Sequence, residues 1–309
     1  MQANELFDRP NTILLDGGMG TMLQAAGLKL GARPEELNIT DPALIEGIHG
    51  QYAAAGSRIV NANTFGASAH KLAGSAYTLE QVITAGIENC KRACAPYGAL
   101  TALDVGPLGE LLEPSGTLAF EDAVAEYARI VKAGEAAGAD LIFFETYTDL
   151  YELKAALLAA KENTHLPILA SMSFEAGGRT FTGCTVESFA ATARGLGADA
   201  VGINCSLGPK EIFPMAKRLA EAVPGNFPVF VKPNAGLPRA DGSGYDITPQ
   251  LFALQMKPYR ELHLFAAGGC CGTTPEFIKL LNSVFAGCVP GRPAHKMPSV
   301  LCTPVDFVN

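Results

Sequence analysis

The residues best suited to chemistry are three cysteines that follow two apolar segments. Cys270 and Cys271 are adjacent in the glycine-rich stretch AAGGCCGTTPEF, and Cys205 ends the apolar run DAVGINC. Thiolates are soft ligands that suit zinc, and three of them leave the fourth position of a tetrahedral ion open for a substrate. The constellation therefore favours a catalytic zinc site over a closed structural one.

The chain is long enough to bury a scaffold for such a site. It has 309 residues, of which 48% are hydrophobic and 17% charged, and these values are typical of a folded soluble protein. A net charge of −8 without any Lys/Arg run argues against a nucleic-acid partner. We find no signal-peptide pattern and no uncharged apolar span of about 18 residues. We expect a cytoplasmic protein with no membrane partner, whose eight cysteines are reduced.

Apolar and helical segments alternate along the whole chain. Eight apolar runs are predicted strands, at residues 13–15, 58–61, 99–104, 140–145, 167–173, 199–204, 228–232 and 262–267. Helical patterns occupy residues 42–55, 79–95, 121–137, 149–163, 186–195, 208–222 and 275–285. Capping residues are expected at Asp41, Thr78, Thr248 and Thr274, and helix-ending glycines at Gly56, Gly138 and Gly197. Eight βα units in a chain of this length predict an α/β fold, a single-domain TIM (β/α)8 barrel, rather than a doubly wound sheet.

In a TIM barrel the active site lies at the carboxyl ends of the strands. Cys205 follows the sixth predicted strand and the cysteine pair follows the eighth, so all three lie on one face of the barrel. Only the seventh strand separates the two strands that carry them. Adjacent cysteines normally point apart. We expect Gly268, Gly269 and Gly272 to supply the unusual dihedrals that aim both sulfurs at one ion.

The cysteine-rich loop has other interpretations. The three thiols could be packed in the core, or the adjacent pair could form a vicinal disulfide. The glycines of residues 268–272 could instead form a phosphate cradle of backbone N–H groups, as the last loops of many barrels do. That function would need no cysteine.

The remaining cysteines favour structural roles. Cys184, Cys288 and Cys302 are predicted to be buried core residues, because cysteine is among the most buried residue types. Cys90 and Cys94 lie four apart on a predicted helix, but no histidine or acidic residue nearby completes a metal site.

Two acidic residues stand at predicted strand ends. Asp16 precedes Gly17-Gly18, where it could be a turn residue, and Glu145 ends the run LIFFE. A carboxylate buried there needs a partner, which could be a cation elsewhere in the barrel or the amino group of a ligand. The five histidines show no HExxH pattern, and the glycines after Asp16 do not satisfy GxGxxG. Neither a histidine-ligated metal nor a dinucleotide is indicated.

Several long motifs resemble one enzyme family. LLDGGMGTMLQ, PEELNITDPALIEGIHGQY, NANTFGA, FFET, GINC and GGCCGTTPEF are similar to the homocysteine-binding domain of the homocysteine S-methyltransferase family, over nearly the whole chain. Within that family they are most similar to the N-terminal module of cobalamin-dependent methionine synthases. The resemblance implies one barrel domain over residues 1–309. It also implies that Cys205, Cys270 and Cys271 bind zinc and are catalytic.

The resemblance also implies a substrate site and a reaction. Asp16, Gly17 and Glu145 would hold the amino-acid end of homocysteine, and Asn234 would occupy the fourth zinc position when substrate is absent. Homocysteine would be activated as a zinc-bound thiolate and methylated to methionine, with the methyl group coming from methylcobalamin carried by another domain or protein. Two alternatives stay open: a free-standing enzyme that uses S-methylmethionine or a betaine, and a non-catalytic thiol-binding module of a corrinoid assembly. The loops at 16–41, 104–120 and 233–248 would receive the corrinoid partner.

Overall fold

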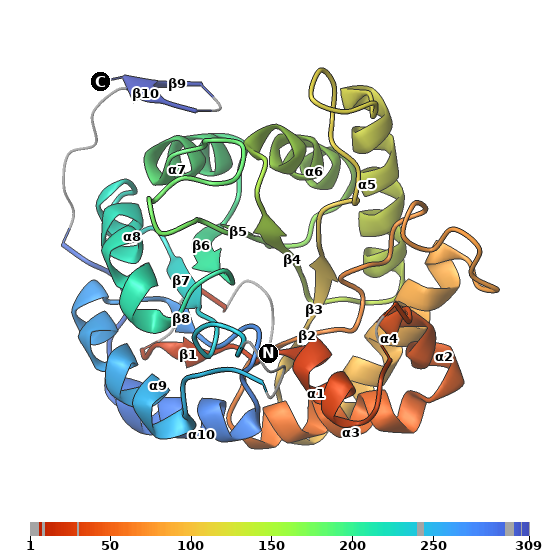
Figure 1. Ribbon diagram of the computed structural model, residues 1–309, viewed down its shortest axis with the longest axis horizontal. Helices are drawn as coiled ribbons and strands as arrows, with labels where there is room; N and C mark the ends of the chain where they lie inside the picture. The colour runs from red at the N-terminus through yellow and green to blue at the C-terminus, as the bar shows by residue number, and fades with distance from the viewer. Residues whose placement is uncertain are drawn as a thin grey trace.

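The protein is a nearly closed barrel of parallel strands surrounded by helices (Figure 1). The computed structural model describes residues 6–7, 10–29, 31–239, 244–293, 300–303 and 305–308. The barrel strands are β1 (Ile13–Leu14), β2 (Ile59–Asn61), β3 (Leu100–Val105), β4 (Leu141–Tyr147), β5 (Ile168–Met172), β6 (Ala200–Asn204), β7 (Val229–Lys232) and β8 (Ala266–Ala267). They pair in the order β1-β8-β7-β6-β5-β4-β3-β2, and a parallel bridge between Leu15 and Ile59 joins the two ends. The predicted single-domain TIM barrel is confirmed.

Helices connect the successive strands. They are α1 (Met19–Ala25), α2 (Leu37–Thr40), α3 (Pro42–Ala54), α4 (Leu79–Cys94), α5 (Phe120–Ala136), α6 (Leu150–Asn163), α7 (Val186–Gly195), α8 (Pro209–Glu221), α9 (Pro249–Met256) and α10 (Pro275–Phe285). Short 3-10 turns are η2 (Pro34–Glu36), η3 (Ala95–Tyr97) and η4 (Lys257–Leu262), and β9 (Leu301–Cys302) pairs with β10 (Phe307–Val308) outside the barrel. Within the described ranges, no helix combines the length and the apolar character needed to cross a membrane.

The local signals in the sequence predicted most helix boundaries. Thr78 forms a capping box with Gln81 at the start of α4, and the side chains of Asp41 and Thr248 accept cap hydrogen bonds at α3 and α9. Thr274 is the N-cap residue of α10, as predicted, but its side chain makes no cap hydrogen bond. Gly56, Gly138 and Gly197 all have the left-handed φ expected of glycines that end helices.

Several elements differ from the prediction. The eighth strand was expected at 262–267 but contains only Ala266 and Ala267, because η4 continues to Leu262 and His263 then has a left-handed φ of 49°. The helices α1 and α2 were not predicted. Neither has a side-chain cap at its start, and α2 is a single turn.

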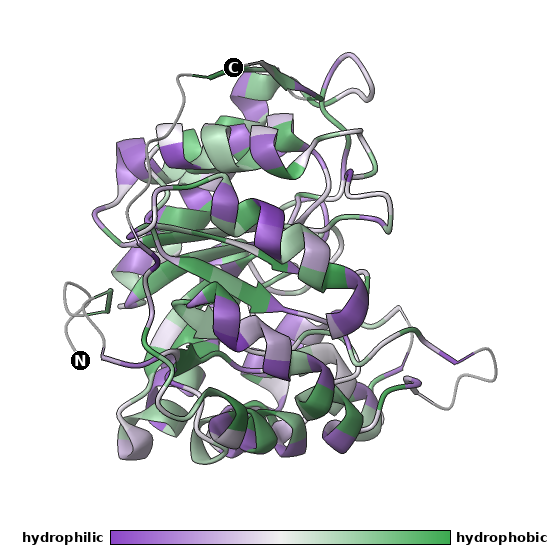
Figure 2. Cartoon of the chain, turned by 90° about the vertical axis from the view of Figure 1, so that its left-hand side faces the viewer, coloured by the Kyte–Doolittle hydropathy of each residue, from purple (hydrophilic) through white to green (hydrophobic). Residues whose placement is uncertain are grey.

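The strands alternate between two hydrophobic cores, and this alternation positions the site. On β2, β3, β4 and β7, the residues Ile59, Ala102, Phe143 and Phe230 belong to the core inside the barrel. Their neighbours Val60, Leu103, Phe144 and Val231 belong to the core beneath the helices, and the apolar strands run between the helical layers in Figure 2. Side chains two residues further along a strand point the same way. The inner core is therefore followed, at the carboxyl ends, by a polar layer of Asn61, Asp104, Glu145, Asn204 and Lys232.

Candidate active site

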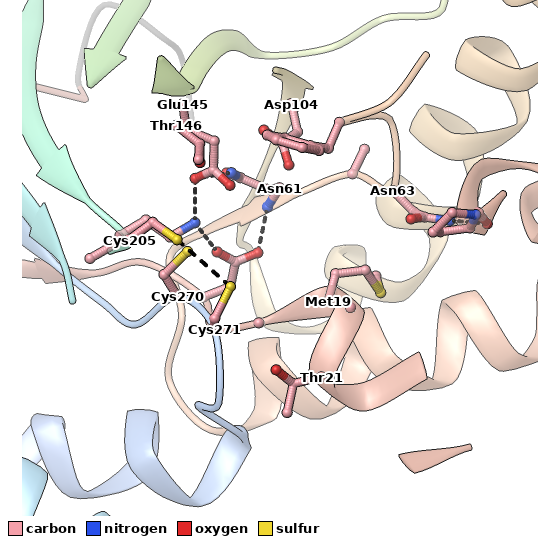
Figure 3. Close-up of a pocket in the computed structure, with 18 of the residues that line it drawn as sticks. Met19, Thr21, Asn61, Asn63, Asp104, Glu145, Thr146, Cys205, Cys270 and Cys271 are labelled. Carbon is pink, nitrogen blue, oxygen red and sulfur yellow. Dashed lines mark hydrogen bonds and ion pairs between the residues drawn. The ribbon is translucent and has the colours of Figure 1, made fainter. Parts of the chain in front are cut away.

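The three predicted cysteines come together at the carboxyl ends of β6 and β8. Their sulfur atoms all lie within 4.8 Å of one another, and the Sγ atoms of Cys205 and Cys271 are 3.7 Å apart (Figure 3). Two sulfurs bonded to one tetrahedral zinc ion at about 2.3 Å would be about 3.8 Å apart. The triangle thus fits zinc. Within the described residues it is the one group of three or more His, Cys, Asp or Glu side chains with ligand atoms this close.

Unusual backbone conformations bring these sulfurs together, at positions that differ from those expected. Cys205 and Ser206 have left-handed φ values of 62° and 61°, which cost side-chain-bearing residues about 1–2 kcal/mol each. Gly272 has a φ of 80°. Gly268 and Gly269 do not have left-handed φ, so that part of the prediction was wrong. Glycine is needed at both positions because a side chain has no room there. A Cβ at Gly268 would lie 2.7 Å from the carbonyl oxygen of Asp16, and a Cβ at Gly269 would clash with the Thr273 side chain.

The loop does not have the free donors of a phosphate cradle. Each backbone N–H from Gly268 to Thr273 already donates to the protein. The acceptors, in order and at 2.8–3.1 Å, are the carbonyls of Val231, Asp16 and Pro233, the side chains of Asn234 and Thr21, and the carbonyl of Cys270. A phosphate site needs N–H groups that point at the ligand. The cysteines are free thiols rather than a vicinal disulfide.

Asn234 supports the second cysteine of the pair. Its Oδ1 atom accepts a hydrogen bond of 3.1 Å from the backbone N–H of Cys271. The backbone N–H of Asn234 donates to the carbonyl of Leu207. Asn234 therefore joins the loop after β8 to the loop after β6. Its occupation of a fourth zinc position stays a prediction.

The contacts within the sulfur cluster favour a thiolate on one of its three cysteines. Contacts with the other two thiols lower the pKa of Cys271 to about 3. The same contacts raise the pKa of Cys270 well above its ordinary value. One thiolate stabilised by two thiols attracts a cation, and a metal would displace the remaining protons.

The sulfurs border a cavity of about 340 Å³, the size of a small-molecule site. Its wall includes the predicted residues Asp16, Gly17 and Glu145 together with Asn61, Asp104, Thr146, Lys232 and Tyr245. Gly17 is required by close packing, because a Cβ there would lie 2.7 Å from Thr273 Oγ1 and 2.8 Å from the Tyr52 ring. The cavity thus has a sulfur end and an end lined by carboxylates and amides.

Lys232 is the site residue that the sequence did not reveal. Only 2% of its side chain is exposed, and its Nζ atom lies 3.0 Å from both Asp16 Oδ1 and Glu145 Oε2. Burial alone would lower the pKa of Lys232, but the two carboxylates raise it well above the ordinary value. Burial raises the pKa of both acids, and Lys232 opposes that rise. Two partners were expected for Glu145, either a cation elsewhere in the barrel or the amino group of a ligand. The structure supplies the cation, which is Lys232. A role of these acids in binding substrate stays a prediction.

Asn204 links the cysteine loop to the acidic end of the cavity. Its side chain accepts from the Thr146 N–H at 2.9 Å, donates to Thr146 Oγ1 at 2.7 Å and accepts from Ser171 Oγ at 2.9 Å. Thr146 has a left-handed φ of 68°, which this bridge stabilises. Asn204 directly precedes Cys205 and Thr146 directly follows Glu145, so the bridge positions both ends of the cavity.

The other cysteines lie outside this site. Cys184 and Cys288 are buried, as predicted. Cys90 and Cys94 are buried together on α4 with their sulfurs 3.8 Å apart. Cys302 is exposed, so its predicted burial was wrong. It belongs to the hairpin outside the barrel, where its sulfur lies 3.3 Å from Thr192 Oγ1.

Comparison with known proteins decides the family. Residues 13–285 match the model of the homocysteine S-methyltransferase family. The chain belongs to this family. The methionine synthases of Mycobacterium tuberculosis and Mycobacterium leprae are 32% and 33% identical over 95% and 89% of the chain. The chain spans only 26% and 24% of the length of those two proteins. The predicted family, one of methyltransferase enzymes, is confirmed.

Solved structures support the fold of this homocysteine S-methyltransferase family member. The oxidized form of the homocysteine methyltransferase MmuM from Escherichia coli is similar with a TM-score of 0.76 and 24% identity, over 91% of this chain and 98% of that one. Its metallated form gives a TM-score of 0.74 over 90% and 98%. At this identity the likeness supports the barrel fold alone.

Proposed function

We propose that this chain is a zinc-dependent S-methyltransferase that methylates homocysteine to methionine, with zinc held by Cys205, Cys270 and Cys271. One observation carries the proposal: three cysteine sulfurs within 4.8 Å of one another border a cavity whose other end is acidic. Membership of the homocysteine S-methyltransferase family supports the reaction. Relatives named methionine synthase support the product.

The chemistry follows from the sulfur end of the cavity. A free thiol has a pKa of about 8.5 and is mostly protonated at neutral pH. A zinc ion on the three thiolates would lower the pKa of a coordinated substrate thiol, which makes that sulfur a nucleophile. The cavity orients the substrate and excludes water, so that the sulfur meets the methyl group in line. The new carbon–sulfur bond forms as the bond between methyl and donor breaks, and its electron pair stays with the donor.

We propose a methylcorrinoid, methylcobalamin on another domain or protein, as the methyl donor. The sequence resemblance and the relatives named methionine synthase support this choice. The cavity is bordered by Thr21 in α1, Asp104 at the end of β3 and Tyr245, one from each of the segments 16–41, 104–120 and 233–248 expected to receive the corrinoid partner. A large donor that reaches the sulfurs would contact these loops.

A turnover assay tests the proposal against its alternatives. Zinc-loaded protein is incubated with homocysteine and with methylcobalamin, S-methylmethionine or glycine betaine in turn, and methionine is measured. We expect methionine from methylcobalamin alone. Methionine from a small donor instead would support a free-standing enzyme. Homocysteine binding without methionine from any donor would leave a thiol-binding module. Cys271→Ser should abolish turnover, whereas Cys302→Ser, at an exposed thiol on the hairpin, should not.

A further inference from the structure

The side chain of Asn204 contacts one of the three cysteine sulfurs. Its Nδ2 atom donates a hydrogen bond of 3.8 Å to Cys270 Sγ. Asn204 is fully buried at the end of β6, and Cys270 is 8% exposed in the loop after β8, so little water competes for this contact. A thiol sulfur is a weak acceptor, but hydrogen bonds to an ionised acceptor are about twice as strong as neutral ones. Because a metal requires the thiolate, the contact becomes stronger in the metal-bound protein.

The other contacts of Asn204 determine which end of its amide faces Cys270. The oxygen and the nitrogen of an asparagine side chain are assigned from their hydrogen-bond partners. The backbone N–H of Thr146 can only donate, and it lies 2.9 Å from Oδ1, which also accepts from Ser171 Oγ at 2.9 Å. Nδ2 is left for Thr146 Oγ1, at 2.7 Å, and for Cys270. With two donors on its oxygen and two acceptors on its nitrogen, the amide makes all the hydrogen bonds that its groups allow.

The two donors on Oδ1 strengthen the contact with sulfur. Hydrogen bonds in a buried chain polarise one another, so donation from Thr146 and Ser171 makes the side-chain N–H groups of Asn204 better donors. The same contacts keep the amide from turning, because a turned amide would place its N–H groups against the N–H of Thr146, and that buried donor would lose its acceptor. The N–H that faces Cys270 is therefore fixed in place before any metal binds.

We propose that Asn204 is a positioning residue of the zinc site, whose side-chain N–H orients the Cys270 sulfur and stabilises it as the thiolate that a metal requires. The inference rests on the proposed function, because it takes the metal to be held by Cys205, Cys270 and Cys271. Through the same amide, the metal ligand Cys270 is connected to Thr146 in the wall of the cavity. Loss of a group that hydrogen-bonds to a metal ligand typically lowers metal affinity by about 10- to 100-fold.

The substitution Asn204→Asp changes this contact selectively. Aspartate has the same shape and keeps acceptor oxygens for Thr146 and Ser171, and the hydroxyl of Thr146 can turn to donate instead of accepting. Three donors then surround the carboxylate and favour its ionised form. Only Cys270 loses its donor, and its thiolate then faces a like charge. We expect zinc affinity, measured by competition with a chromophoric chelator, to fall by at least about 10-fold. An unchanged affinity would overturn the inference.

A matched control and a spectrum separate this role from a general loss of structure. Ser171→Ala removes a different hydrogen bond of the same amide and should lower zinc affinity far less; an equal loss in both variants would overturn the inference. In cobalt-substituted protein, the sulfur-to-cobalt charge-transfer band should move to longer wavelength in Asn204→Asp, because a thiolate without a donor holds its electrons less tightly. It should stay in place in Ser171→Ala. A band at the wild-type position in Asn204→Asp would count against the contact with Cys270.

A measurement on the wild type tests the contact even if Asn204→Asp fails to fold. The protein is labelled with a heavy nitrogen isotope and loaded with an NMR-active cadmium isotope. We expect a scalar coupling between cadmium and a side-chain N–H of Asn204, transmitted through Cys270 Sγ. If folded, cadmium-loaded protein shows no such coupling, the inference fails and the proposed function stands. Wild-type protein that holds neither zinc nor cadmium overturns the proposed function as well.

Discussion

Replacing Lys232 by Met removes the cation between two buried carboxylates and keeps most of the side-chain volume. The Nζ atom lies 3.0 Å from both Asp16 and Glu145, where each pair is worth about 5.5 kcal/mol at an effective dielectric constant of about 20. Desolvation of the three charges offsets much of this sum, and breaking a buried pair typically costs about 3–5 kcal/mol. We expect the variant to lose that much free energy of unfolding at about pH 8.

The loss should depend on pH in a definite direction. Burial raises the pKa of Asp16 and Glu145, and Lys232 opposes that rise. Without the lysine, both acids have pKa values in the folded protein above those of the unfolded chain. Such groups stabilise the folded state at low pH, and that contribution is lost as the pH rises through the folded-state pKa. The deficit relative to the wild type should therefore shrink as the pH falls from about 8 to about 5.

Urea denaturation of the zinc-free proteins at both pH values measures this deficit. The exposed residue Lys217 on α8 supplies a control, since Lys217→Met should change stability by less than about 0.5 kcal/mol. Adding Glu145→Gln to Lys232→Met should recover part of the loss, because one uncompensated charge disappears. A deficit below about 1 kcal/mol, or one that is equal at both pH values, would refute the claim that Lys232 neutralises the two acids.

Three further changes have expected outcomes. Thr78→Ala removes the capping box of α4 and should cost about 1 kcal/mol by urea denaturation; an unchanged midpoint would contradict this. Ser206→Gly relieves a left-handed φ of 61° and should raise the free energy of unfolding by about 0.5–1 kcal/mol, whereas a loss would show that the serine side chain outweighs the strain. Chelation should abolish methionine formation and leave the far-ultraviolet circular dichroism unchanged, because the sulfurs lie above the barrel core. Loss of helical signal would instead give the metal a structural role.

The barrel and the cysteine triangle could be predicted because both follow from local patterns. Most of the apolar runs alternated with helical segments, and in a barrel the carboxyl ends of all strands meet on one face. Cys205 and the pair at 270–271 therefore had to converge. The backbone conformations that bring the three sulfurs together could not be predicted from the sequence. Cys205 has a left-handed φ, and a residue that carries a side chain gives no signal for this conformation as a glycine would.

The polar layer was harder to predict, although part of its signal is present in the sequence. Alternation along β2, β3 and β7 places Asn61, Asp104 and Lys232 on the inner face, two residues beyond apolar residues of the inner core. A lysine at a strand end is normally solvent-exposed. Its burial depends on Asp16 and Glu145, which lie 216 and 87 residues away in the chain. Only the closed sheet brings them to one point.

Zinc content is the most direct test of the central claim. Protein purified without chelator is analysed for metal as the wild type, as Cys271→Ser and as the matched control Cys302→Ser. The account predicts about one zinc per chain in the wild type and the control, and much less in Cys271→Ser. Freshly reduced wild-type protein that holds no zinc even after the metal is supplied would contradict the thiolate site, and with it the proposed methyl transfer.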